Sequence, residues 1–166
     1  MAEPGEELVD RFRAVVLRRP VGVTVISVRA GGLDLAMTAT DVASVSLRPP
    51  RILFCVYSDA RLRESLETTD TWAVSLLDAT AAPVAERLAE PGRPSIGQLT
   101  GIRHHRGEAT GAALVDAAQG WLECRTAWVR TAGDHDVVVG EVLDARLGPT
   151  GTGALVHHHG RLRPLP

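Results

Sequence analysis

The chain has 166 residues with 45% hydrophobic and 23% charged side chains, which describes one folded globular domain with a sizeable core and excludes a disordered chain. The net charge is −2 and arginine is scattered along the sequence, so no basic face for nucleic acid is expected. No apolar run approaches the roughly 18–20 residues of a membrane-spanning helix. The acidic N-terminus differs from a signal peptide, so we expect a cytoplasmic protein with no membrane contact.

The first predicted elements are a helix and a β-hairpin. Residues 6–19 carry apolar side chains at helical spacing, and Pro20 ends this helix. Residues 21–28 are rich in β-branched side chains, which predicts a strand. A Gly-rich turn at residues 30–32 then leads to the hairpin partner at residues 33–37.

The rest of the chain also favours strands over helices. Residues 52–57 form a continuous apolar run, which predicts a strand buried on both faces. The later elements are predicted as a helix at 60–68, a strand at 71–77, a helix at 81–89, a long polar loop at 95–118, strands at 121–130 and 136–146, and a last short strand at 154–162. Short strands joined by hairpins, with inserted helices, favour a mainly β barrel in a single domain over residues 1–166, with residues 1–20 as a leading helix.

The cysteines and histidines give no sign of a metal site. Cys55 and Cys124 both lie inside apolar runs, so we expect reduced core residues rather than a disulfide or a metal pair. Residues 157–159 are three consecutive histidines, which alternate between the two faces of a strand and do not converge on one ion. No metal is therefore expected.

The most informative stretch is residues 35–57, which read LAMTATDVASVSLRPPRILFCVY. Four hydroxyl side chains precede a double proline that ends the predicted loop and starts the apolar strand; they are Thr38, Thr40, Ser44 and Ser46. Small hydroxyl groups beside backbone N–H groups suit a polar or phosphate-bearing ligand. The alternative is that these hydroxyls satisfy the backbone of their own loop, as Ser and Thr commonly do.

This stretch resembles the signature of the flavin reductase-like family, in which a Met-Thr segment and a Ser-Val-Ser-Leu-x-Pro-Pro segment precede a hydrophobic strand. The resemblance extends over residues 12–163. The other matching segments are Val21-Gly22-Val23-Thr24-Val25, residues 71–77 (TWAVSLL), Trp121-Leu122-Glu123-Cys124, Gly133-Asp134-His135 and Val138-Val139-Gly140-Glu141-Val142. No G-x-G-x-x-G fingerprint is present, but the family folds the nicotinamide over the flavin and needs no such motif.

The resemblance implies a fold, an activity and partners. The fold is an FMN-binding split β-barrel with short inserted helices. The activity is NAD(P)H:flavin oxidoreduction, with FMN or FAD as the flavin and NADH or NADPH as co-substrate. The reduced flavin is released to a partner monooxygenase, and the protein is a homodimer with each cofactor site near the subunit interface.

The resemblance also implies the residues of the site. The flavin would be held by Thr38, Ala39, Thr40, Asp41, Ser44, Val45, Ser46, Ser58 and Arg61, with Arg161 near the site. His135 would assist nicotinamide binding or proton handling, and an ordinary hairpin-turn histidine is the alternative.

Three positions depart from the family pattern at the phosphate end. Asp41 and Asp59 place carboxylates where members have small neutral side chains, and Leu62 replaces a threonine. A carboxylate 4 Å from a phosphate charge costs about 4 kcal/mol at an effective dielectric of about 20, unless Arg61 or Arg63 offsets it. These departures favour two alternatives: a protein that has lost reductase activity and binds or transforms another small molecule, or a non-catalytic partner.

Overall fold

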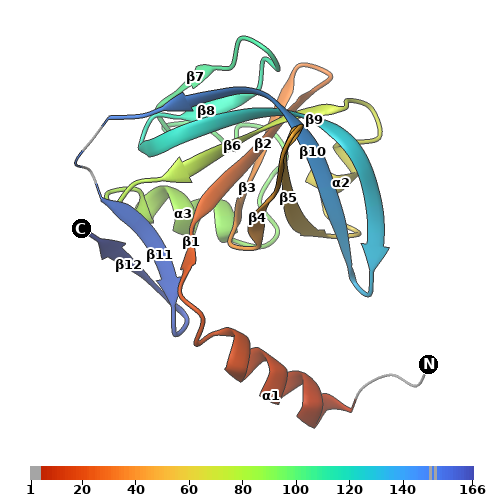
Figure 1. Ribbon diagram of the computed structural model, residues 1–166, viewed down its shortest axis with the longest axis vertical. Coiled ribbons are helices and arrows are strands. Elements are labelled where there is room, and N and C mark those ends of the chain that lie inside the picture. Colours follow the sequence, from red (N-terminus) through yellow and green to blue (C-terminus); the bar gives the residue numbers. More distant parts are fainter. Residues whose placement is uncertain (1–4, 150, 152) are drawn as a thin grey trace.

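A seven-stranded antiparallel sheet forms the body of the computed structural model, which describes residues 5–149, 151 and 153–166. The sheet curls into a barrel (Figure 1). In their order across the sheet, its strands are β3 (Leu33–Ala39), β2 (Thr24–Ala30), β6 (Thr71–Leu77), β9 (Ala118–Ala132), β10 (His135–Leu147), β5 (Pro50–Tyr57) and β4 (Val42–Leu47). The expected mainly β barrel with few short helices is confirmed.

Two smaller sheets and three helices complete the chain. The sheets consist of β1 (Val21–Gly22), β11 (Ala154–His158) and β12 (Arg161–Leu165), and of β7 (His104–Arg106) and β8 (Ala113–Val115). The helices are α1 (Glu6–Val16), α2 (Arg61–Ser65) and α3 (Ala82–Ala89). Helix α3 contacts β3, and α2 contacts β2 and β3, whereas α1 projects away from the barrel (Figure 1). Among the described residues, no helix is both long and apolar enough to cross a membrane.

The structure corrects four of the expected elements. Residues 42–47, expected as a loop, form the edge strand β4, which pairs with β5 through a tight turn. The predicted strand at 21–28 is divided between β1 and β2, which belong to different sheets. The predicted strand at 154–162 is a hairpin of β11 and β12, because His159 and Gly160 adopt positive φ angles of 51° and 71° and turn the chain.

The expected loop at 95–118 contains the hairpin of β7 and β8, and a buried side chain supports it. The carboxylate of Glu123 accepts hydrogen bonds from the backbone N–H groups of Ala109 (3.0 Å) and Thr110 (2.7 Å) in the turn. Glu123 lies on β9 and is 1% exposed, and Arg146 donates to its other oxygen at 3.0 Å. The turn is therefore held by a distant residue, which a local sequence pattern does not reveal.

Burial along β5 differs from the expectation. Ile52, Phe54 and Val56 are buried in the core, where the Phe54 ring packs edge-on against Trp72 with centroids 4.7 Å apart. The alternate residues of the strand are only partly buried, so β5 is not buried on both faces.

Cys124 is a free, buried thiol as expected, but the free Cys55 is half-buried on the outer face of β5 and is not a core residue.

Candidate functional site

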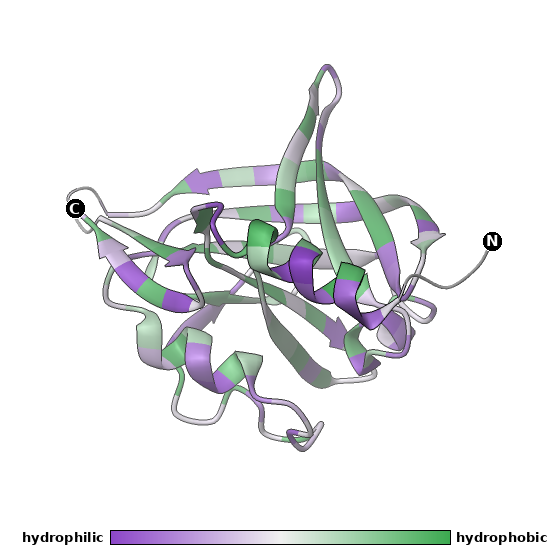
Figure 2. Ribbon diagram, turned by 90° about the horizontal axis from the view of Figure 1, so that it is seen from below, coloured by the Kyte–Doolittle hydropathy of each residue, from purple (hydrophilic) through white to green (hydrophobic). Residues whose placement is uncertain are grey.

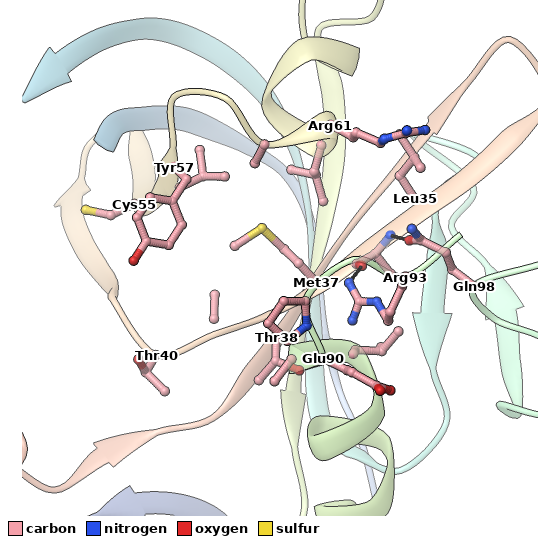
Figure 3. A pocket seen from close by; sticks show the side chains of 18 of the residues that line it. Leu35, Met37, Thr38, Thr40, Cys55, Tyr57, Arg61, Glu90, Arg93 and Gln98 are labelled. Atoms are coloured by element: carbon pink, nitrogen blue, oxygen red, sulfur yellow. Dashed lines mark hydrogen bonds between the residues drawn. The ribbon is translucent and has the colours of Figure 1, made fainter. Parts of the chain in front are cut away.

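A cavity of about 530 Å³ lies between β3, the end of β5, the start of α2 and the segment that follows α3. Cofactor sites commonly have volumes of roughly 300–1,000 Å³. Figure 3 shows Tyr57 and Cys55 at one end of the cavity and Arg93 and Gln98 at the other, with Met37 between them. The cavity therefore has an aromatic end and a cationic end.

The aromatic end depends on the pairing of β5 with β10, which places His135 directly opposite Tyr57. Their rings pack with centroids 4.0 Å apart and an interplanar angle of 36°. The Asp134 carboxylate lies 2.7 Å from His135 Nδ1 and can only accept, so Nδ1 carries the proton of this hydrogen bond. Nε2 is then the ring nitrogen that is available to a ligand in the cavity. The same bond holds the pKa of Asp134 below its usual value.

A buried carboxylate anchors the turn that follows β5. Asp136 accepts hydrogen bonds from the Ser58 hydroxyl (2.9 Å) and from Arg63 Nε (2.5 Å), and it is 3% exposed. The hydrogen bond from Arg63, followed by those from Thr131 and Ser58, holds the pKa of Asp136 below its usual value. The Ser58 backbone N–H donates to the Asp134 carbonyl at 3.1 Å. The Ser58 hydroxyl is therefore committed to Asp136, and Ser58 does not line the cavity.

The three departures from the family pattern have different surroundings. Asp41 lines the cavity and forms an exposed ion pair with Arg19 at 3.0 Å. Asp59 is exposed and does not line the cavity. Leu62 lines the cavity and packs in the hydrophobic core. It therefore contributes apolar contacts at the position where the family pattern has a threonine hydroxyl. The sequence suggested Arg61 or Arg63 as the cation that offsets the negative charge of these carboxylates. For Asp41, the paired cation is Arg19.

Six of the sequence-predicted residues line this cavity: Thr38, Ala39, Thr40, Asp41, Arg61 and His135. The Thr38 hydroxyl donates to the Ala85 carbonyl at 2.7 Å, so it is already satisfied within the fold. Ser44 and Val45 are exposed on β4, and the Ser46 hydroxyl accepts from the Arg48 backbone N–H at 3.2 Å. Ser44, Val45 and Ser46 do not line the cavity, and their roles stay predictions.

Arg161 lies in a neighbouring cavity that shares Thr38 and Thr40 with the first one. His157 and Arg87 also line this second cavity. Within residues 5–149, 151 and 153–166, no group of three or more His, Cys, Asp or Glu side chains is arranged to hold a metal ion.

Sequence reasoning missed Tyr57, Arg93 and Gln98. Tyr57 is the only tyrosine of the chain and ends an apolar strand, which gives it a signal that sequence inspection can find. Arg93 and Gln98 come from the segment after α3: Arg93 lies between the predicted helix at 81–89 and the predicted polar loop at 95–118, and Gln98 lies in that loop. Both contact Ala36 on the edge strand β3: Gln98 accepts from its N–H at 2.9 Å, and Arg93 donates to its carbonyl at 3.1 Å.

Comparison with known proteins identifies the family. The model of the flavin reductase like domain matches residues 16–166, so the chain belongs to this family, as expected from the sequence. An NADH-dependent FAD reductase of Streptomyces globisporus is 39% identical over 158 residues, covering 92% of this chain and 86% of that protein. The reductase component of 4-hydroxyphenylacetate 3-monooxygenase from Thermus thermophilus is 34% identical over 154 residues, covering 93% of this chain and 95% of that protein.

A solved structure agrees with this assignment. The NADH:FAD oxidoreductase SgcE6 of Streptomyces globisporus C-1027, in complex with NAD and FAD fragments, has a TM-score of 0.88 and 33% sequence identity to this chain. The match covers 100% of this chain and 96% of the solved one. The expected split-barrel fold is thereby confirmed.

Replacing the buried carboxylate should destabilise the fold in a pH-dependent way. Because the pKa of Asp136 is lowered in the folded state, its ionised form stabilises the fold above the unfolded value of about 3.9, and this contribution is lost as the pH falls through the lowered pKa. We expect Asp136→Asn to lower the urea midpoint at pH 7, and the difference from wild type to shrink below about pH 4. Asp59→Asn, an exposed neighbour, is the matched control; an equal loss in both variants at every pH would contradict this account.

Proposed function

We propose that this chain is an NAD(P)H-dependent flavin reductase that supplies reduced flavin to a separate monooxygenase. The observation that carries the proposal is a single cavity with His135 and Tyr57 at one end and two arginine side chains, Arg61 and Arg93, among its other lining residues. A flavin nucleotide has this same polarity, because a flat conjugated ring and a phosphate lie at opposite ends of a ribityl chain. NADH is the favoured reductant because the Streptomyces globisporus relative described above is NADH-dependent.

The residues present fit a flavin nucleotide. Met37, Tyr57 and Ala39 supply apolar and aromatic surface for the ring. At the cationic end, Arg93 lines the cavity, and its buried Nε has no hydrogen-bond partner among the described residues. Each of its two Nη atoms uses one N–H for a backbone carbonyl, so the second N–H of each is left for an anionic ligand.

A bound flavin supplies the redox chemistry, since it accepts a hydride from the nicotinamide. The chain's own residues bind and orient the reactants. The Asp134 carboxylate fixes His135 with its proton on Nδ1, and the Tyr57 ring supports one face of the imidazole. His135 Nε2 would then contact the nicotinamide ring or the diphosphate of the dinucleotide. Partial enclosure of the cavity limits the access of water.

The homodimer implied by the family is part of the proposal, and helix α1 supports it. Its apolar side chains are exposed in the monomer: Leu8 (52%), Val9 (39%), Phe12 (66%), Val15 (68%) and Val16 (38%). Figure 1 shows the helix away from the barrel, and Figure 2, seen from below, shows that it carries both hydrophobic and hydrophilic residues. An exposed apolar face of this extent is typical of a protein interface, and we assign it to a second copy of the chain. The single domain over residues 1–166, with α1 as its leading helix, likewise stays a prediction.

A cytoplasmic location is also proposed. It is supported by two free cysteines, which are usual in a reducing compartment. The alternative of a repurposed, inactive reductase fold rested on the carboxylates at the phosphate end. The ion pair of Asp41 with Arg19 and the position of Asp59 outside the cavity weaken that alternative.

The test of the proposed function is a fluorescence titration with FMN and FAD, followed by addition of NADH or NADPH to the same sample. We expect micromolar flavin binding and oxidation of the nicotinamide, followed by absorbance at 340 nm. Binding without oxidation would support the repurposed protein, and no binding of either flavin would refute the proposal.

Removal of the histidine should slow turnover. Because His135 would contact the nicotinamide, His135→Ala should lower kcat/KM for NADH by about tenfold or more, equivalent to about 1.4 kcal/mol, without changing the thermal midpoint. His158→Ala, which lines neither cavity, is the control. Unchanged kinetics in His135→Ala would show that the residue is an ordinary turn histidine.

A charge on the apolar face of α1 should separate the subunits. Phe12→Asp places a carboxylate in the proposed interface, and Ala14→Asp adds the same charge on the opposite side of the helix. We expect sedimentation equilibrium to report a dimer for wild type and Ala14→Asp and a largely monomeric Phe12→Asp. A monomeric wild type, or a fully dimeric Phe12→Asp, would contradict the assignment of this face.

A further inference from the structure

The phosphate end of the cavity has fewer donors than the family pattern implies. The Ser58 hydroxyl and backbone N–H are bonded to Asp136 and to the Asp134 carbonyl. Leu62 has no hydroxyl, and Arg63 is paired with the buried Asp136. Of the two arginines that follow this turn, Arg61 and Arg63, only Arg61 lines the cavity. A flavin phosphate needs further positive charge or hydrogen-bond donors from elsewhere in the chain.

Arg93 supplies both from outside the family's sequence motifs. It lies on the segment after α3, and its two Nη atoms donate to the backbone carbonyls of Arg87 (3.0 Å) and Ala36 (3.1 Å). These two bonds fix the guanidinium beside β3. The Nε atom is buried and has no partner among the described residues. The side chain is therefore held in place by the backbone while part of its donor capacity stays unused.

Arg93 and Arg61 both line the cavity. Arg61 donates a hydrogen bond to the Ser95 hydroxyl, which is only two residues from Arg93. In Figure 3 both guanidinium groups lie across the cavity from Tyr57 and Cys55. Burial lowers the pKa of Arg93 from its usual value, and the nearby Glu90 carboxylate opposes this effect. A partly desolvated cation in such a place gains from an anionic ligand.

We propose that Arg93, together with Arg61, binds the phosphate group of the flavin nucleotide and replaces the hydroxyl donors that this chain lacks. The inference rests on the proposed flavin function and adds a residue that the family motifs do not contain. It makes the chain selective for phosphorylated flavins, FMN and FAD, over riboflavin. Glu90, which also lines the cavity, partly screens this charge.

The test compares the dissociation constants of riboflavin, FMN and FAD for wild type and Arg93→Gln. The amide of glutamine keeps a donor for the Ala36 carbonyl but removes the charge. We expect FMN and FAD to bind about 10- to 100-fold more weakly to the variant, with riboflavin unchanged within about twofold. Arg103→Gln is the control, because the Arg103 side chain is 91% exposed and lines neither cavity.

The results for the Arg93→Gln variant test the phosphate-binding role of Arg93, whereas flavin binding by the wild type tests the proposed function. Equal weakening of all three ligands would mean that Arg93 only holds the cavity wall, and unchanged FMN binding would mean that it does not touch the phosphate; either result overturns the inference. A wild-type protein that binds no flavin would instead refute the proposed function itself, and the inference with it.

If Arg93→Gln fails to fold, the variant Glu90→Gln tests the same phosphate site. Glu90 is exposed, so Glu90→Gln should leave the fold intact while it removes the charge that opposes phosphate binding. We expect this variant to bind FMN several-fold more tightly than wild type at low ionic strength, with riboflavin affinity unchanged. An unchanged FMN affinity, or a parallel change for riboflavin, would contradict a phosphate at this end of the cavity.

Discussion

The antiparallel pairing of β5 with β10 is the constraint on which the site depends. Its register places Tyr57 opposite His135, and it therefore brings the turn after β5 against the turn before β10. The Ser58 N–H closes this contact on the Asp134 carbonyl. A one-residue slip would reverse the facing of every side chain on the strand and would separate the aromatic pair from the cavity. The buried Asp136 adds a second link, since it holds Ser58 and Arg63 from the opposite face of β10.

The opposite wall of the cavity depends on how an edge strand is covered. Strand β3 lies at one edge of the seven-stranded sheet, so its outward backbone groups have no strand partner. The segment after α3 satisfies both groups of Ala36 with the side chains of Gln98 and Arg93. Covering the edge in this way also brings a guanidinium group into the cavity. The same two side chains thus complete the fold and give the cavity its cationic end.

The sequence predicted the barrel and much of the site because these features are local. The apolar run of residues 71–77 and the Gly-Asp turn before His135 specify a strand and a hairpin without reference to the rest of the chain. The order of the motifs then gave the family. Thr38, Asp41 and Arg61, which that resemblance implies, line the cavity, and their contact with a flavin stays a prediction.

The features that the sequence did not reveal depend on distant contacts. The ion pair of Asp41 with Arg19 joins residues 22 positions apart, and the bond from Ser58 to Asp136 joins residues 78 positions apart. Arg93 follows a Pro-Gly break, where composition indicates only the end of a helix. The hairpin of β7 and β8 is held by Glu123 from another strand. Each of these requires the tertiary fold, because no local pattern encodes the partner.

A crystal structure of the chain with bound FMN would show where the flavin ring and its phosphate lie. We expect the isoalloxazine ring along residues 38–41 with one edge near His135, and the phosphate between the guanidinium groups of Arg61 and Arg93. A flavin bound in the neighbouring cavity beside Arg161, or a phosphate directed away from both arginines, would contradict this expectation.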